Sequence, residues 1–234
     1  NREIEEKEGL LQDLESPVDL KLVQLTHHKN TLVDVRKYSV QYADTENSVF
    51  SDLTFTIHRG ERVALSGKNG SGKSTLLKRI LQKNGFIHEE FSISEKGLCE
   101  IASGLVISYV GQDATGLKGD ITTFCREHDL DLSLFCTILR QLDFERVQFS
   151  KNMEEYSEGQ KKKVLLAASL LTPAHLYVWD EPLNYIDVFS QMQIEKLLLE
   201  YQPTMLFVEH DVRFQEKIAT KIIEIVAEIS PENI

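Results

Sequence analysis

The chain has 234 residues, and its 26 Lys and Arg against 37 Asp and Glu give a formal net charge of −11. A chain of this length buries about 70–75% of its unfolded surface, which suits one domain with a second lobe. The acidic balance argues against nucleic-acid binding through the overall field, because such domains are usually basic. The net charge does not exclude a local basic patch or a basic segment outside this sequence.

Cysteine usage and apolar runs set the expected compartment. Cys99, Cys125 and Cys136 share no CxxC spacing and lie among apolar residues, which favours buried free thiols in a reducing cytosol. The longest apolar run, residues 164–171, is far too short to span a bilayer. No signal peptide is visible and the chain does not begin with Met, so we expect a piece of a longer cytoplasmic protein.

The predicted elements alternate between strands and helices. Residues 2–15 are charged and helix-prone, with a short leucine stripe, and we expect the end of a helix or a frayed, solvated end there. In chain order we then expect strands at 32–42, 53–58 and 62–67, a helix at 74–82, a strand at 104–110, helical structure over 121–148 and 158–171, a strand at 175–179, a helix at 188–201, a strand at 204–208, a short helix, and a strand at 221–226. This alternation predicts a mostly parallel α/β sheet, and the helical block at about 115–165 predicts a second lobe.

The sequence GKNGSGKST matches the pattern G-x-x-x-x-G-K-[ST] between a strand and a helix. Glycines in such a loop let successive backbone N–H groups point inward around phosphates, and the start of the next helix faces the same phosphates. Lys73 is expected to reach the β- and γ-phosphates, and the Ser74 hydroxyl to ligate Mg²⁺. We therefore expect this phosphate loop to hold the phosphates of a nucleotide through Gly67, Lys68, Asn69, Gly70, Ser71, Gly72, Lys73, Ser74 and Thr75.

A second motif, VWDEPLNYID at residues 178–187, ends an apolar strand in two adjacent carboxylates. Taken alone, such a pair is more typical of a helix N-cap and first turn. Beside a phosphate loop, Asp180 is expected to hold Mg²⁺, and Glu181 is expected to orient and deprotonate the attacking water.

Three weaker signals follow the same logic. Gln112 comes after a strand and is expected to contact Mg²⁺ and the lytic water, while a surface hydrogen-bonder is the alternative. His210 comes after another strand and is expected to contact the γ-phosphate, with a structural histidine as the alternative. The stretch YSEGQ places Ser157 and Gly159 at the start of a long helix, where either an anion site or an ordinary N-cap fits.

With these motifs in this order, the chain resembles the ATP-binding-cassette (ABC) nucleotide-binding domain over about residues 30–228. The resemblance implies an α/β P-loop NTPase (RecA-like) core, an antiparallel β subdomain, and a helical subdomain inserted at about 115–165, all within residues 30–234. It also implies that two such domains close head to tail, each capping the ATP held by the other.

The resemblance carries further residue roles. It implies that Ser157, Gly159 and Gln160 cap the partner's nucleotide. It further implies that Tyr42 stacks on adenine and that Asp187 lies at the dimer seam. The stretch departs from the family's LSGGQ at Tyr156 and Glu158, and a carboxylate at 158 must point away from the γ-phosphate or weaken the closed state.

Two stretches narrow the resemblance to the ABC-F class. NYID at 184–187 has that class's Asn-aromatic-aliphatic-Asp form, and EHDVRF at 209–214 resembles its stretch after the last core strand. The class implies two nucleotide domains on one chain joined by a helical linker, no membrane segment, and action on the ribosome. Residues 2–15 fit the end of such a linker, which makes this the second domain. The stretches DEPLNYID and YSEGQKKKV look closest to the antibiotic-resistance branch, which protects the large ribosomal subunit from antibiotics.

Two alternatives stay open at this point. An ABC membrane transporter's ATPase subunit also lacks membrane segments of its own, so the motifs alone do not separate it from an ABC-F domain. A P-loop kinase or small GTPase leaves residues 156–160 and His210 without a role, and the sequence has no guanine-reading N-K-x-D.

Overall fold

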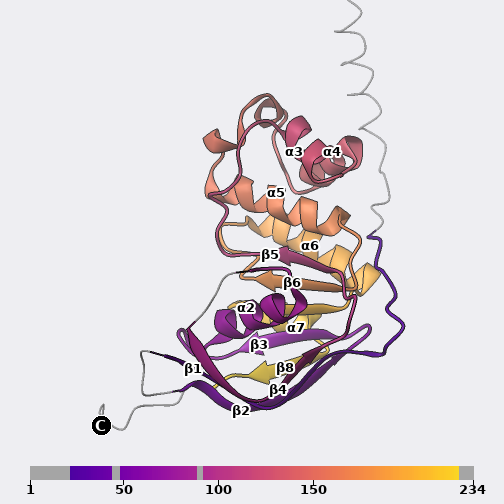
Figure 1. The fold of residues 1–234 in the computed structure, drawn as a ribbon. Coiled ribbons are helices and arrows are strands. Elements are labelled where there is room, and N and C mark those ends of the chain that lie inside the picture. Colours follow the sequence, from indigo (N-terminus) through magenta and orange to yellow (C-terminus); the bar gives the residue numbers. More distant parts are fainter. Residues whose placement is uncertain (1–21, 44–47, 89–91, 227–234) are drawn as a thin grey trace, which may run out of the picture.

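The computed structural model describes residues 22–43, 48–88 and 92–226, so the helix expected at 2–15 lies outside the described residues. The strands are β1 (Thr31–Tyr42), β2 (Ser48–His58), β3 (Arg62–Ser66), β4 (Ile93–Ile101), β5 (Ile107–Val110), β6 (Leu176–Asp180), β7 (Met205–Val208) and β8 (Lys221–Glu224) (Figure 1). The helices are α2 (Lys73–Asn84), α3 (Ile121–Glu127), α4 (Leu132–Gln141), α5 (Glu158–Leu171), α6 (Val188–Tyr201) and α7 (Val212–Ile218), with 3-10 turns η2 (Arg146–Ser150) and η3 (Met153–Glu155).

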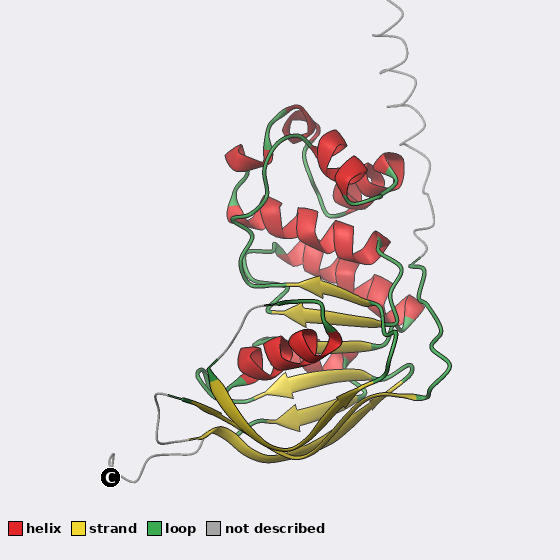
Figure 2. Cartoon of the chain, viewed as in Figure 1, coloured by secondary structure: helices red, strands yellow, loops and turns green. Residues whose placement is uncertain are grey.

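Two sheets organise the described chain (Figure 2). The larger has the strand order β5-β6-β7-β3-β8, and every neighbouring pair in it is parallel. The smaller has the order β2-β1-β4 and is antiparallel. Because all five strands run in the same direction, their carboxyl ends meet at one edge of the larger sheet, and the crossover connections return the chain to the opposite edge. The loops after β3, β5, β6 and β7 therefore lie close together.

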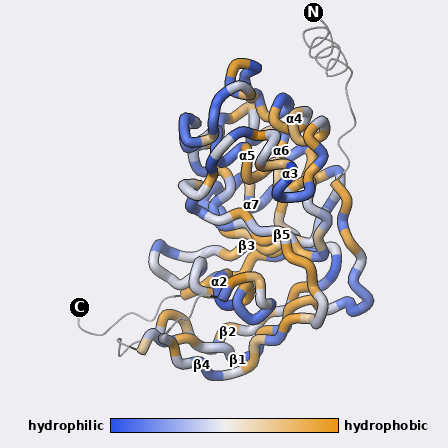
Figure 3. Tube along the Cα trace, turned by 45° about the horizontal axis from the view of Figure 1, so that its top comes forward, coloured by the Kyte–Doolittle hydropathy of each residue, from blue (hydrophilic) through white to orange (hydrophobic). Residues whose placement is uncertain are grey.

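Alternation along the parallel strands divides the apolar residues into two cores. On β6, Leu176 and Val178 face one core, while Tyr177 and Trp179 face the other. The first core holds α2 between the two sheets, and the second lies under α5, α6 and α7 (Figure 1). Figure 3 shows β3 and β5 as hydrophobic stretches through the middle of the molecule. The phosphate loop is thus followed by a helix, α2, that packs between the two sheets.

The helical stretch expected at 121–148 is broken into separate elements. Asp120 caps α3 by accepting from the Thr123 amide at 2.9 Å, and Asp131 caps α4 by accepting from the Leu134 amide at 2.8 Å. Between them Asp129 adopts a left-handed backbone with φ 54°. Short acidic side chains satisfy the orphan amides of a new helix, so each of these caps starts an element.

Strand β4 is absent from the sequence-based predictions. Its sequence, ISEKGLCEI, has no apolar alternation, and Cys99 is its buried residue. The strand forms because it pairs along β1, from Val33 opposite Ile101 to Tyr42 opposite Ile93. The strands expected at 53–58 and 104–110 are instead Ser48–His58 and Ile107–Val110.

The cysteines are free, as predicted. Cys99 and Cys125 are buried, whereas Cys136 is half-buried. Burial raises the pKa of Cys99 to about 11, which keeps this thiol protonated and unreactive at neutral pH.

Candidate functional site

A pocket of about 590 Å³ opens at the carboxyl edge of the parallel sheet. In sheets of this kind, ligands bind at this edge, beside the N-terminus of a helix. Its lining combines the phosphate loop with single residues from the loops after β5, β6 and β7 and from the antiparallel sheet. The lining residues are Tyr42, Val49, Asn69, Gly70, Gly72, Lys73, Ser74, Thr75, Gln112, Glu181 and His210.

The phosphate loop has a shape that only glycine permits at two positions. Gly67 has φ 143°, and a Cβ there would lie 2.3 Å from the carbonyl oxygen of Ile225. Gly72 has φ 94°, and a Cβ there would lie 2.6 Å from Val49 Cγ1. The loop therefore forms a narrow cradle that leads into the first turn of α2, whose free amides suit an anion.

The Lys73 side chain lies inside this loop. It is buried, and Nζ donates to the carbonyl oxygens of Gly67 at 2.8 Å and Lys68 at 2.9 Å. The Ser71 hydroxyl is buried in the same loop and has no hydrogen-bond partner within the described residues. A cation and an unpaired polar group are thus available where a phosphate would sit.

Three side chains from different elements meet beside the cradle. Ser74 Oγ donates to Asp180 Oδ1 at 3.3 Å, and Gln112 Nε2 donates to Asp180 Oδ1 at 3.2 Å. Asp180 is buried, and burial raises its pKa more than the hydrogen bonds from Ser74 and Gln112 lower it. A hydroxyl, a carboxylate and an amide are the hard ligands that Mg²⁺ prefers.

Replacement of Asp180 by Asn is expected to stabilise the nucleotide-free protein at neutral pH, because an ionised carboxylate is buried there at a cost. Because the pKa of Asp180 is raised in the native state, the gain is absent below about pH 3.9, the ordinary value, grows above it, and is complete above the raised pKa. Urea unfolding of both forms between pH 4 and pH 8 measures this difference. An Asp180→Asn variant that is less stable than the wild-type protein at pH 7 would contradict the cost of burying an ionised carboxylate at this position.

Glu181 is held on both carboxylate oxygens. Its backbone has φ 51° and its amide donates to the Val208 carbonyl at 2.9 Å, which joins the ends of β6 and β7. Oε1 lies 3.1 Å from His210 Nε2, and Oε2 accepts from Asn184 Nδ2 at 2.6 Å. Sequence reasoning missed the Asn184 contact: NYID served only to indicate a protein class.

Tyr42 reaches the pocket from the end of β1. Its hydroxyl shares a hydrogen bond with Thr75 Oγ1 at 3.0 Å, and its side chain is partly exposed. The phosphate loop therefore has an aromatic ring beside it, although the adenine-stacking role stays a prediction.

The stretch at residues 156–160 lies outside this pocket. Ser157 and Gln160 form a capping box, in which Ser157 Oγ accepts from the Gln160 amide and Gln160 Oε1 accepts from the Ser157 amide. Glu158 forms an exposed ion pair with Lys161 at 3.1 Å. A Cβ at Gly159 would lie 2.4 Å from the Tyr185 carbonyl oxygen, so this glycine allows the 184–187 turn to approach α5.

Residues 50–184 match the family model described as ABC transporter. The chain belongs to this family. Its ABC domain has the predicted α/β fold class, with a P-loop NTPase core and an antiparallel sheet, and the family is one of ATP-binding ATPase domains.

Curated relatives of the ABC domain are much longer than this chain. It is 31% identical over 195 residues to "Ribosome protection protein VmlR" of Bacillus subtilis, covering 82% of this chain and 34% of that protein. It is 29% identical over 202 residues to "ATP-binding protein Uup" of Buchnera aphidicola, covering 83% and 32%. The chain thus spans about a third of the length of these relatives.

One solved structure has the same fold. It is described as "Structure of ATP binding subunit of ABC transporter", and it superposes with a TM-score of 0.65 at 25% identity, covering 83% of this chain and 86% of that one. In the part of the ABC domain that the structure describes, no helix has the length and apolar character needed to cross a membrane.

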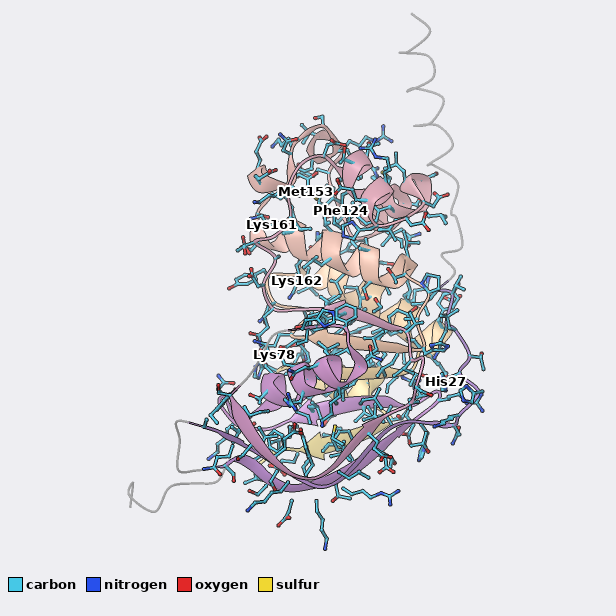
Figure 4. The ribbon with its side chains drawn as sticks, viewed as in Figure 1. His27, Lys78, Phe124, Met153, Lys161 and Lys162 are labelled. Carbon is cyan, nitrogen blue, oxygen red and sulfur yellow. The ribbon has the colours of Figure 1, made fainter. Side chains whose placement is uncertain are left out.

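Two lysines of α5 tie the helical layer of the ABC domain to the site loops. Lys162 is buried on α5 above β5 (Figure 4), and its Nζ donates to the Gly111 carbonyl at 2.8 Å, directly before Gln112. Burial lowers the pKa of Lys162, although Asp180 and the other nearby acids oppose the shift. Lys163 Nζ lies 2.7 Å from Asp187 Oδ2. Displacement of α5 would therefore move the loops that carry Gln112 and Asp187.

Replacement of Asp187 by Asn is expected to destabilise the ABC domain by no more than about 1 kcal/mol, because the ion pair is partly exposed. Burial alone would raise the pKa of Asp187, but hydrogen bonds from Lys163 and Ser190 lower it to about 2. A lowered pKa stabilises the native state above about pH 4, and this contribution is lost as the pH falls through 2. Thermal unfolding across this range, with Lys163→Met alone and combined, measures the coupling. A stability difference between the wild-type protein and Asp187→Asn that does not change with pH would contradict the lowered pKa of Asp187.

Proposed function

We propose that Glu181 is the general base of Mg²⁺-dependent ATP hydrolysis in this ABC domain. The observation that carries the proposal is that Glu181 lines the phosphate-loop pocket with hydrogen-bond partners on both carboxylate oxygens. Asp180, one residue earlier, turns instead into the buried cluster with Ser74. The two adjacent acids therefore have separate environments, which suits separate roles.

The described residues fit the groups that such a reaction needs. Backbone amides of the loop and Lys73 would hold the phosphates of ATP, and Ser74, Asp180 and the amide oxygen of Gln112 would hold Mg²⁺. The ion, when bound, supplies positive charge against the phosphate oxygens. Tyr42 lies where it would stack on the base.

Glu181 then takes a proton from the attacking water, while the water oxygen bonds to the γ-phosphorus and the bond to the β-γ bridging oxygen breaks. His210 lines the same pocket and would donate a hydrogen bond to the terminal phosphate. Gln112 would orient the water.

A second nucleotide-binding domain is part of the proposal. Ser157, Gly159 and Gln160 do not line the pocket of their own chain, which supports a role in capping a nucleotide held by another domain. Directly after the carboxylates, Tyr185 and Val188 are 77% and 73% exposed, and Phe189 and Met192 are also exposed. Exposed apolar side chains grouped in this way support closure against a partner domain.

The wider role rests on the relatives. One of them is described as a ribosome protection protein, and we propose that this chain is the second nucleotide-binding domain of a cytoplasmic ABC-F protein that acts on the large ribosomal subunit and protects it from antibiotics. Residues 2–15 would be the end of its interdomain linker. The second candidate is the ATPase subunit of an ABC membrane transporter, which the matched structure supports.

Co-sedimentation of the full-length protein tests this role. The Glu181→Gln variant with ATP is expected to pellet with ribosomes, because the ATP-bound closed state would persist. At an ATP concentration that saturates the wild-type site but not the weakened site of Lys73→Ala, the Lys73→Ala variant is expected to stay in the supernatant. Recovery of both variants in the membrane fraction, with none on ribosomes, would support the transporter subunit and contradict the ribosomal role.

A further inference from the structure

Asn184 makes the shorter of the two hydrogen bonds to the Glu181 carboxylate. Its Nδ2 lies 2.6 Å from Oε2, against 3.1 Å between His210 Nε2 and Oε1. An ionised carboxylate only accepts hydrogen bonds, so it requires the amide nitrogen of Asn184, not its oxygen, to face it. Glu181 is thus fixed by one donor from its own turn and one from the loop after β7.

The turn that carries Asn184 is itself held in place. The Leu183 amide donates to Glu209 Oε2 at 3.1 Å, and Glu209 is buried. On the other side, the Tyr185 carbonyl packs against Gly159 at the start of α5. Because the backbone on both sides of Asn184 is fixed, its short side chain has little freedom to leave Glu181.

The two donors differ in their access to the nucleotide. His210 lines the pocket and its side chain is 46% exposed, so a bound nucleotide would compete for its N–H. Asn184 does not line the pocket, so its amide has no such competitor. A neutral amide also orients the carboxylate without adding a full positive charge beside it.

We propose that Asn184 is a positioning residue for ATP hydrolysis: its amide holds Oε2 of Glu181 and leaves Oε1 directed to the pocket. This inference rests on the proposed role of Glu181 as the general base.

Steady-state kinetics of the full-length protein tests the inference. Asn184→Ala is expected to lower kcat for ATP hydrolysis by about 10–100-fold, the effect of a catalytic group misplaced by about 1 Å, with KM little changed. Asn184→Asp should lower it further, because an isosteric carboxylate repels Glu181, while Asn184→Gln keeps the amide and should retain more activity than Ala. Asn152→Asp, the same substitution at an exposed position outside the pocket, is the matched control.

A double-mutant cycle separates positioning from a structural role. In a Glu181→Gln background, Asn184→Ala should not lower the residual rate further, since the base that it holds is gone. A wild-type rate for Asn184→Ala, or an equal loss in both backgrounds, overturns the inference. If Glu181→Gln abolishes turnover and Asn184→Ala leaves the turnover rate unchanged, the positioning role of Asn184 is contradicted and the base role of Glu181 is retained. Wild-type turnover of Glu181→Gln itself removes the base assignment as well.

Discussion

Replacement of Glu181 by Gln is expected to lower the rate of ATP hydrolysis by about 10²–10⁴-fold while ATP binding survives. The carboxylate lies at the pocket rim, where its oxygens contact His210 and Asn184, and it takes no part in the cradle formed by residues 67–75. Glutamine has nearly the same shape but cannot accept the proton from water at neutral pH. Single-turnover and steady-state rates, measured beside ATP affinity in the full-length protein, give the two quantities separately.

The control for this substitution is Glu216→Gln on α7, an exposed glutamate outside the pocket, which should keep the wild-type rate. The base assignment requires that the loss lie in kcat. Turnover at the wild-type level in the Glu181→Gln variant, or a loss that disappears at saturating ATP, would exclude Glu181 as the base.

Replacement of Lys73 by Ala is expected to weaken ATP binding by about 10–100-fold, as removal of a hydrogen bond to a charged group costs about 1.5–3 kcal/mol. In the nucleotide-free protein, the ammonium donates to the carbonyls of Gly67 and Lys68 and so occupies the centre of the loop. The same group is positioned to exchange these carbonyls for phosphate oxygens, which carry full negative charge.

Calorimetric titration of ATP into both proteins measures the change. Lys78→Ala removes an exposed lysine from the same helix (Figure 4) and should leave the affinity unchanged, since its side chain does not line the pocket. Equal affinities of the Lys73→Ala variant and the wild-type protein would refute the assignment of residues 67–75 as the phosphate site.

Strong local patterns predicted the fold class. The apolar strands at 175–179 and 204–208 correspond to β6 and β7, and their burial on both faces is typical of a parallel sheet. The helix at 158–171 is confirmed, because Ser157 and Gln160 form the capping box that starts it.

Patterns that depend on distant partners were missed. Strand β4 is polar in sequence and becomes a strand through its hydrogen bonds to β1, so its own residues carry no signal. Within residues 121–148, Asp131 caps the start of a new helix, so the chain forms two helices and not one. The hydrophobic periodicity of a long window does not reveal a single capping residue of this kind.

The sequence by itself determined the phosphate loop and the carboxylate pair, because a glycine-rich turn before a helix and a strand ending in Asp-Glu are local features whose geometry depends on neighbouring residues. Only the tertiary structure decided what each acid contacts. Glu181 meets His210 across 29 residues of sequence and Asp180 meets Ser74 across 106, and such contacts exist only once parallel strands bring their carboxyl ends to one edge. The role proposed for Asn184 depends on the same arrangement, because its turn is held by Glu209, which directly follows β7.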